Sequence, residues 1–291
     1  MVIHNTTVLR TVPTARPTRG AAEARKIRTG APAAKPRIQS LARADAILSA
    51  VAGAPDGTAR LQDLSRALEL NRTTVFNLAE SLVALGFLIK DRSTNRYRLG
   101  LRNIELGRAV TRRSDMLARC RPALVRICHQ TGETVNLAVP HLSSALIIES
   151  YEGRHGVRAT AYAGTRSAYH SSACGKALLA KLAPAVRRQI YEIAGLKRLT
   201  QRTITDIEAL ERDLQTVGRK GYAVEIEENE VGAFCVAMSL ADPFGEPLAA
   251  ISVAGVTQRM APDTIARFAA LLKEEMPRLE ELLIGDPEAG R

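Results

Sequence analysis

The chain has 291 residues, 46% of them apolar and 24% charged, which excludes a protein disordered throughout and fits about two domains. No stretch approaches the roughly 18 uninterrupted apolar residues of a membrane-spanning helix, and the four cysteines form no CxxC pair, which excludes a zinc ribbon or finger. The formal net charge of +11 favours a polyanionic partner, and the scattered cysteines favour a reducing cytoplasm over a secreted disulfide scaffold.

The positive charge is concentrated in the first part of the chain. Residues 1–37 hold eight basic residues and one acidic residue, residues 38–113 hold twelve and seven, and residues 114–291 hold 21 and 22, so the net charges are +7, +5 and −1. A basic segment is typical of proteins that contact DNA phosphates, because each contact releases condensed counterions. The neutral remainder is suited to a different task, such as binding a small molecule.

Residues 1–37 predict a disordered basic tail. They are rich in Arg, Thr, Ala and Pro and show no apolar period, so they cannot bury enough surface to offset the entropy of ordering. An organelle transit peptide has a similar composition, and a tail that serves only solubility is a further alternative. A basic arm that lies along DNA phosphates is the alternative to targeting. We favour a flexible arm of marginal function.

The next segment predicts three helices and a β-hairpin. Apolar residues recur every three or four positions in three runs, Asn71 is a suitable N-cap for the third, and Glu69 stands where the preceding turn often has glycine. The predicted elements are a helix ending before Gly53, helices at 61–68 and 72–85, and strands at 87–90 and 96–99. This order is typical of a winged helix-turn-helix domain, here residues 38–99, whose third helix enters the major groove of DNA.

The third helix and the hairpin carry side chains that can contact DNA. Arg can pair with guanine, Asn with adenine, and Thr with a phosphate or a thymine methyl group. Alternate residues of a strand face the same way, so two hairpin arginines can follow a phosphate backbone. The predicted DNA contacts are Arg72, Thr73, Thr74 and Asn77 on the helix, and Arg92, Arg96 and Arg98 on the hairpin. An ordinary polar helix beside a solvated hairpin is the alternative.

Residues 100–119 predict a linker helix, and the remainder predicts an α+β domain. Pro122 is suited to the first position of the next helix and Gly132 to its end. The predicted strands are 134–139, 145–150, 157–162, 222–226, 234–239 and 248–255, and the predicted helices are 171–182, 184–194, one from Ile207, and 262–283 with a bend at Pro277. Strands separated by a helical block and followed by further strands are typical of an antiparallel sheet.

Catalytic and metal sites find little support in this second domain. Gly175-Lys176 lacks the first glycine and the Ser/Thr of a phosphate-binding loop. Cys174 with the nearby His170 resembles a thiol nucleophile and its base, but no third group orients the pair, and a buried, inert cysteine is commoner. The remaining candidates, His129, His141 and His155, have no metal-ligand spacing. We therefore expect no enzyme, no metal and no cofactor.

Several short motifs, taken in their order along the chain, resemble the IclR family of bacterial transcription regulators. They are Ile38-Gln39-Ser40-Leu41, the helix-turn-helix from Leu61, Arg96-Tyr97-Arg98-Leu99-Gly100, Thr131-Gly132-Glu133-Thr134, the segment from His170 to Ala180, Glu227-Glu228 with Gly232 and Cys235, and the segment from Ala250 to Gly255. The resemblance covers about residues 38–285, and the ordered set is more specific than any single motif.

The resemblance implies a winged-helix domain, a linker helix, a GAF-like effector-binding and oligomerisation domain at residues 120–285, and a flexible end at 286–291. It also implies an effector pocket lined by the start of the helix after the third strand and by the last strands, at Ala173, Cys174, Glu225, Cys235, Ser252 and Ala254. Glu225 stands where the family commonly has Asp, and Ala254 where it commonly has Ser, which favours a pocket shaped for a different ligand.

The sequence thus predicts a cytoplasmic, ligand-responsive transcription regulator without a membrane partner. A homodimer or tetramer would place recognition helices in successive major grooves of a near-palindromic double-stranded operator. A small organic metabolite bound in the second domain would bias the spacing of those helices. A thiol-dependent enzyme fused to a DNA-binding domain and a constitutive architectural DNA binder are the alternatives.

Overall fold

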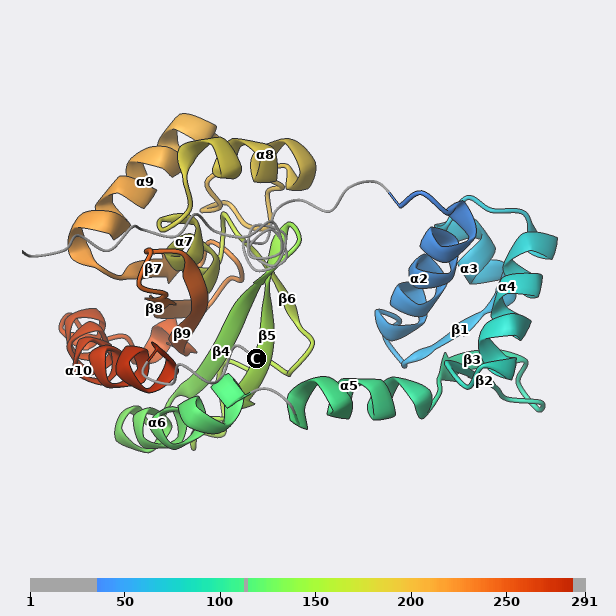
Figure 1. The fold of residues 1–291 in the computed structure, drawn as a ribbon, viewed down its shortest axis with the longest axis horizontal. Helices are drawn as coiled ribbons and strands as arrows, with labels where there is room; N and C mark the ends of the chain where they lie inside the picture. The colour runs from blue at the N-terminus through green and yellow to red at the C-terminus, as the bar shows by residue number, and fades with distance from the viewer. Residues whose placement is uncertain (1–35, 113–114, 285–291) are drawn as a thin grey trace, which may run out of the picture.

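A computed structural model describes residues 36–112 and 115–284, which form two bodies connected by a helix (Figure 1). Of the predicted basic tail, only residues 36 and 37 are described, and the predicted flexible end at 286–291 lies outside the described residues. In the described ranges, no helix is both long enough and apolar enough to cross a bilayer.

The first body consists of three helices and a three-stranded antiparallel sheet of order β1-β3-β2. Its elements are α2 (Gln39–Ala52), β1 (Thr58–Arg60), α3 (Leu61–Ala67), α4 (Arg72–Ala84), β2 (Leu88–Lys90) and β3 (Arg96–Leu99). The three helices and the hairpin agree closely with the predicted ones. Strand β1 was not predicted, because three residues are too few for an alternating pattern to stand out. The core is formed by Ile47, Val51, Leu64, Val75, Ala79, Leu82, Leu88 and Tyr97.

The turn between α3 and α4 departs from the usual glycine-containing turn but keeps its geometry. Glu69 adopts a φ of 53°, in the left-handed region that favours glycine. The Ser65 hydroxyl donates to the Leu70 carbonyl oxygen at 2.6 Å and closes the turn from the α3 side. The positive φ at Glu69 costs roughly 1–2 kcal/mol, which the packing of the two helices offsets.

The connection to the second body consists of α5 (Arg102–Arg112) and the first turns of α6 (Asp115–Thr131). The prediction that Pro122 opens a helix is wrong, because Pro122 lies inside α6. A proline inside a helix costs one backbone hydrogen bond. Here the buried apolar side of α6, formed by Leu117, Cys120, Leu124 and Ile127, offsets that cost. Gly132 closes α6 as predicted, with a φ of 71° and its N–H donating to the Cys128 carbonyl.

The second body is built on a six-stranded antiparallel sheet of order β6-β5-β4-β9-β8-β7. Its strands are β4 (Thr134–His141), β5 (Ser144–Tyr151), β6 (Arg166–Ala168), β7 (Ala223–Ile226), β8 (Ala233–Ala241) and β9 (Pro247–Val256). Its further helices are α7 (Ala173–Leu179), α8 (Pro184–Ala194), α9 (Ile207–Lys220), the 3-10 turn η1 (Thr257–Arg259) and α10 (Thr264–Ile284), which contains Pro277. The α+β class with an antiparallel sheet is thereby confirmed.

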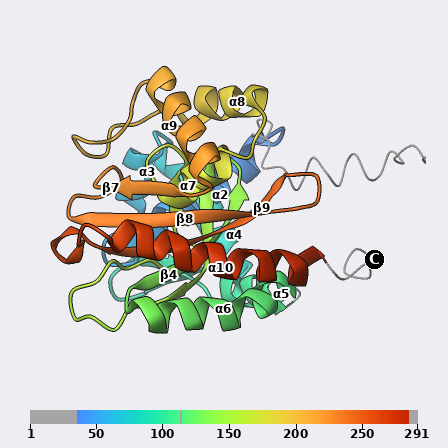
Figure 2. The ribbon, with the colours of Figure 1, turned by 90° about the vertical axis from the view of Figure 1, so that its left-hand side faces the viewer.

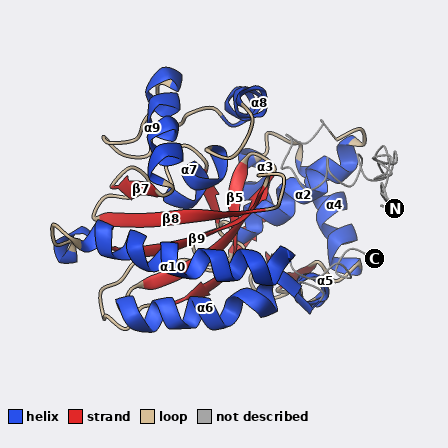
Figure 3. Cartoon of the chain, turned by 60° about the vertical axis from the view of Figure 1, so that its left-hand side comes forward, coloured by secondary structure: helices blue, strands red, loops and turns tan. Residues whose placement is uncertain are grey.

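The helices cover both faces of this sheet. Helices α6 and α10 pack on one face, over a core that includes Leu137, Phe234 and Ile251. Helix α7 packs on the other face, with α8 and α9 outside it (Figures 2 and 3). Since side chains alternate along each strand, neighbouring residues of β4, β8 and β9 face different helical layers.

The predicted strand at 157–162 is wrong, and the third strand of the sheet is β6 instead. In the loop before β6, backbone carbonyls bond to side chains rather than to a neighbouring strand. The Arg259 guanidinium donates to the Val157 carbonyl at 2.7 Å, and the Thr134 hydroxyl donates to the Ala159 carbonyl at 2.5 Å. Side-chain donors therefore replace the strand ladder there.

Candidate functional site

The exposed face of α4 carries most of the predicted contact residues of this helix. Asn71 caps the helix, since its side-chain oxygen accepts from the Thr74 N–H at 2.7 Å. Arg72, Thr73 and Asn77 are exposed, whereas Thr74 is half-buried. The buried side of α4, formed by Val75, Ala79 and Leu82, holds the helix against α2 and α3. The helix thus presents a polar surface with one positive charge.

The arginines of the hairpin fall into two groups. Arg92 and Arg98 are exposed. Arg96 instead forms an ion pair with Asp56 at 2.6 Å and donates to the Thr58 hydroxyl at 2.7 Å, which fastens β1 to β3. Arg96 is therefore partly committed to the structure of the first body, while Arg92 and Arg98 can meet an external anion.

A polar network connects α4 to the hairpin beside this surface. Lys90 pairs with Glu80 at 2.9 Å, and the Tyr97 hydroxyl donates to the same carboxylate oxygen at 2.9 Å. These hydrogen bonds lower the pKa of Glu80. The Lys90 ammonium also lies 5.3 Å from the centre of the Phe76 ring. This network fixes the angle between helix and hairpin, and the sequence did not single it out.

In the second body, the predicted effector residues come together on the α7 face of the sheet. Glu225 pairs in register with Cys235, and Cys235 pairs with Ala254. Ser252 lies two residues before Ala254 in β9, on the same face of the sheet, and pairs with Ala237. Cys174, in the first turn of α7, lies against Ser252, whose hydroxyl is also close to Cys235. Ala173 is fully buried beside Cys174. The six residues therefore form one cluster.

The two thiols of this cluster are unsuited to nucleophilic attack. Burial raises the pKa of Cys174 to about 11 and that of Cys235 well above its usual value. The His170 Nε2 is bonded to the Lys197 carbonyl at 2.9 Å, and among the described residues no hydrogen bond connects the His170 ring to Cys174. Within residues 36–112 and 115–284, no group of His, Cys, Asp and Glu side chains is arranged to hold a metal ion.

Glu225 is the ionisable member of the cluster. It is 3% exposed, and its Oε1 accepts from the backbone N–H groups of Glu228 and Asn229 at 2.8 and 3.1 Å. Burial raises its pKa to about 7, against the opposing effect of the two N–H groups. Near neutral pH the carboxyl group is therefore divided between its protonated and ionised forms.

Replacing Glu225 by glutamine is expected to flatten the pH dependence of stability. Because the folded-state pKa of Glu225 is raised from 4.5 to about 7, the wild type loses stability as pH rises through this window, whereas the variant does not. From pH 5 to pH 8 the free energy of unfolding of the variant should gain about 2 kcal/mol relative to wild type. Denaturant unfolding at several pH values measures this. The exposed Glu192→Gln is the control, and parallel curves for Glu225→Gln and wild type would contradict the expectation.

The sequence missed two buried polar groups next to the cluster. Lys176 of α7 has a side chain that is 1% exposed, and its Nζ lies 2.7 Å from Glu228 and 3.1 Å from Asp213 of α9. Asn136 of β4 links the Ser252 hydroxyl, at 3.4 Å, to that of Ser150, at 2.7 Å. A lysine in the apolar run of α7 is a signal that could have indicated a buried charge. Asn136 has no comparable signal.

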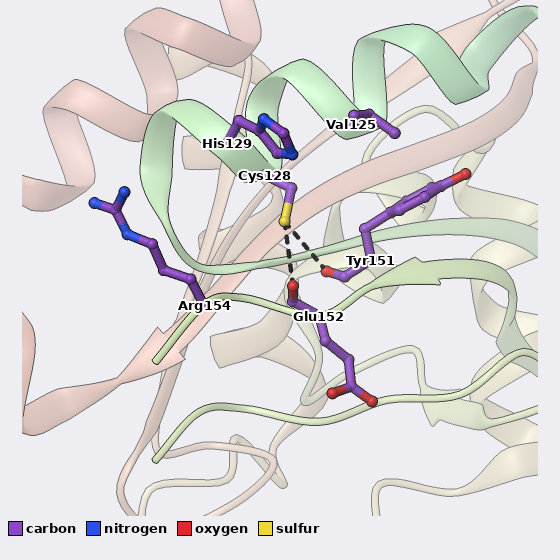
Figure 4. Close-up of a pocket in the computed structure, with 6 residues that line it drawn as sticks. All are labelled: Val125, Cys128, His129, Tyr151, Glu152 and Arg154. Atoms are coloured by element: carbon purple, nitrogen blue, oxygen red, sulfur yellow. Dashed lines mark hydrogen bonds between the residues drawn. The ribbon is translucent and has the colours of Figure 1, made fainter. Parts of the chain in front are cut away.

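A surface pocket of about 410 Å³ lies apart from the cluster, between the end of α6 and the end of β5 (Figure 4). The Cys128 thiol donates to the carbonyl oxygens of Tyr151 and Glu152 at 3.7 and 3.4 Å. Burial raises the pKa of Cys128, so this thiol is a structural donor rather than a nucleophile. None of the predicted effector residues lines this pocket.

Known proteins resemble the chain over both bodies. Residues 108–278 match the family model for the C-terminal region of the bacterial transcriptional regulator IclR, and residues 40–92 match the IclR helix-turn-helix domain. The chain is 35% identical, over 248 residues, to the HTH-type transcriptional regulator BhcR of Paracoccus denitrificans, which covers 85% of this chain and 87% of BhcR.

Two solved structures extend this similarity to the fold. An IclR transcriptional regulator from Alicyclobacillus acidocaldarius has a TM-score of 0.74 at 26% identity, covering 85% of this chain and 99% of that one. An IclR homologue from Microbacterium hydrocarbonoxydans, in complex with 4-hydroxybenzoate, has a TM-score of 0.68 at 27% identity, covering 84% of this chain and 98% of that one.

Proposed function

Because the chain belongs to the IclR family of bacterial transcriptional regulators, we propose that it binds a near-palindromic operator and that a small metabolite in its second body sets its affinity for that DNA. The protein is a DNA-binding transcription regulator and not an enzyme. We place it in the cytoplasm, where bacterial DNA lies.

The exposed polar face of α4 supports the DNA-binding half of the proposal. We propose that the side of α4 with Arg72, Thr73, Thr74 and Asn77 faces the major groove, with Asn77 reading a base edge. The backbone N–H of Thr74 donates to the Asn71 cap and so holds the start of the helix in place. Arg92 and Arg98 of the hairpin would contact phosphates. We assign Arg96 a double role, in holding β1 and in adding positive charge.

Removing Arg98 is expected to weaken binding to every DNA sequence. Arg98→Ala should lower the slope of log affinity against log salt by about one, because one phosphate contact is lost. Arg96→Ala should also lower the melting temperature slightly, because it releases β1.

Asn77→Ala should instead weaken binding to the operator by about 1–3 kcal/mol and leave binding to random DNA unchanged. Fluorescence anisotropy over a salt series measures all three.

Two outcomes would contradict these roles. An unchanged salt slope for Arg98→Ala would remove it from the phosphate contacts. Equal losses on operator and random DNA for Asn77→Ala would show that it reads no base.

Exposed apolar side chains on and beside α5 support assembly as a homodimer or tetramer. Leu101, directly before this helix, and Ile104 and Val110 within it are 68%, 53% and 72% exposed. Large apolar side chains gathered on one exposed segment are typical of a surface that another chain covers. We propose that a second copy packs on this segment, which would pair two α4 helices for the two halves of the operator.

The buried polar cluster under α7 carries the effector half of the proposal. Glu225, Cys235 and Ser252 place a carboxyl, a thiol and a hydroxyl group on one sheet face, beside Ala173 and Cys174 and next to Ala254. We propose a ligand with one acidic end, near Ala173 and Cys174, and one hydroxyl or amine, near Glu225. The 4-hydroxybenzoate bound to the Microbacterium homologue has a carboxylate and a hydroxyl group and belongs to this class.

The experiment that tests this proposal is a substitution in the cluster. Cys174→Leu should fill the site, leave operator binding intact and abolish the response to the effector. In the wild type, we expect the coupling free energy between effector binding and operator binding to be about 1–3 kcal/mol. Binding of the protein to the promoter DNA of its own gene is measured with and without each member of a metabolite library. This assay identifies the effector and measures the response to it. Leu178→Met, on the same buried helix, is the control that should keep the response.

The other outcomes separate the alternatives. A Cys174→Leu protein that responds with unchanged affinity would place the effector elsewhere. DNA affinity indifferent to every metabolite would favour an architectural DNA binder.

A further inference from the structure

A second pocket, of about 330 Å³, lies in the same body but away from the effector cluster. Its walls come from the turn between β4 and β5, the segment from Arg166 to His170, the end of α8 and the loop that follows α8. None of the six predicted effector residues lines it. Residues distant in sequence therefore enclose a separate space that the proposed function does not use.

The polar rim of this pocket is cationic. Arg166 and Lys197 line it, and their side chains are exposed and make no ion pair or hydrogen bond with other described residues. The hydroxyl groups of Ser143 and Ser144 lie on the same wall. Since residues 114–291 carry a net charge of −1, two unpaired cations at one pocket are a local departure from the charge of the whole body.

A buried hydroxyl group at this pocket has no partner. Tyr169 lines the pocket and is 2% exposed, and its hydroxyl oxygen makes no hydrogen bond with the described residues. The backbone N–H of His141, at the end of β4, faces this oxygen as a donor. The Tyr169 O–H itself has no acceptor among the described residues. A buried donor without an acceptor is costly, and a ligand oxygen would remove that cost.

The remaining wall is apolar. Ile190, Leu196 and Leu199 contribute aliphatic surface, and Tyr191 contributes its ring. The Tyr191 hydroxyl is already bonded to Glu211 at 2.8 Å, so only the ring is available to a ligand. Apolar walls with a few polar groups at one end are typical of sites for small organic molecules.

We propose that this pocket binds a small carboxylate with a flat or short apolar body, at a site separate from the effector cluster. The carboxylate lies at the Arg166–Lys197 rim, where one of its oxygens accepts from the Tyr169 hydroxyl, and the apolar body lies against Tyr191 and Leu196. A neutral amide of the same shape lacks the charge that the two cations require.

The test uses the full-length protein with benzoate as the probe and benzamide as its neutral counterpart. Ligand-observed NMR and calorimetric titration should give saturable benzoate binding and at least tenfold weaker benzamide binding. The Arg166→Ala/Lys197→Ala double variant should lose at least tenfold in benzoate affinity. Lys181→Ala/Arg188→Ala, two exposed cations outside this pocket, is the matched control and should bind as wild type does.

Tyr169→Phe is the second, independent variant. It should weaken benzoate binding severalfold while leaving the melting temperature unchanged or higher, because it removes a buried hydroxyl that has no protein partner. A clear fall in melting temperature would show that the hydroxyl is bonded within the protein, and would overturn its role as a ligand donor.

Three results would overturn the proposal: no saturable benzoate binding, equal binding of benzamide, or binding that Cys174→Leu abolishes while Arg166→Ala/Lys197→Ala preserves it. The last result would mean that the effector cluster is the only carboxylate site. Operator binding and its response to the effector are measured separately on the same variants. Failure of the second site and failure of the proposed function are thus distinguishable.

Discussion

Replacing Lys176 by methionine is expected to lower the free energy of unfolding of the second body by about 3 kcal/mol at pH 8. The Lys176 side chain is 1% exposed and neutralises Glu228 and Asp213, whose side chains are 14% and 34% exposed. Methionine fills a similar volume but leaves two carboxylates facing a buried space without a cation. Removing one partner of a buried pair costs more than the pair contributes, because the remaining charge stays desolvated.

The loss should depend on pH in a defined direction. Burial raises the pKa of Glu228, while Lys176 opposes this rise, so Lys176→Met should raise the pKa further. A carboxyl group with a raised pKa takes up a proton in the folded state at low pH, so the deficit of the variant should shrink towards pH 5 and grow towards pH 8. Denaturant unfolding at both pH values measures this, with the exposed Lys181→Met as control. A deficit independent of pH would show that lost packing dominates.

Gly175→Ala is expected to destabilise the second body by about 3 kcal/mol and to displace α7. A Cβ atom at this position would lie 2.5 Å from both the Cα and the carbonyl oxygen of Tyr169, and 2.7 Å from the carbonyl oxygen of Ala168. These are backbone atoms, so no rotamer change relieves the overlap. Since Gly175 follows Ala173 and Cys174 in the same helix, its displacement should also abolish the effector response.

Gly218→Ala provides the matched control. Gly218 lies in α9, and a Cβ atom there has no heavy atom within 4 Å. An alanine in an exposed helix is favoured over glycine, so this variant should be more stable by about 0.5–1 kcal/mol. Thermal unfolding and operator binding of both variants check the pair. Gly175→Ala with wild-type stability would mean that the segment before α7 can move away without cost.

The sequence predicted best those features that repeat along the chain. Amphipathic helices such as α4 and α9 carry their own period, and Asn71 and Asp206 cap them by local hydrogen bonds to Thr74 and Ala209. Such signals involve residues three or four positions apart, so a single sequence contains them completely.

The features that the sequence did not predict depend on partners far along the chain. Residues 157–162 have the composition of a strand, yet their carbonyls bond to Thr134 and Arg259. Pro122 remains inside α6 because the sheet beneath that helix offsets the lost bond. Lys176 is buried only because Asp213 and Glu228 meet it. No local sequence pattern indicates these long-range contacts.

The predicted site residues show the same difference between what the sequence indicates and what depends on distant contacts. The family resemblance placed six residues on separate elements, and the register of β7, β8 and β9 brings them to one face. The resemblance did not indicate that Arg96 would be bonded to Asp56 and Thr58, because β1 is too short to be recognised from its sequence.

The order of the strands has a consequence for synthesis of the protein on the ribosome. The central pair of the sheet joins β4 to β9, with Thr134 opposite Ala254, about 120 residues later in the chain. The strand pairings of the first body span at most 40 residues, from Thr58 to Arg98, and this body emerges first, so it can fold while the sheet still lacks its middle. On the proposed function, a chain that stalls before β9 would therefore contact DNA without a complete effector site, and its unpaired β4 edge would be free to join other chains.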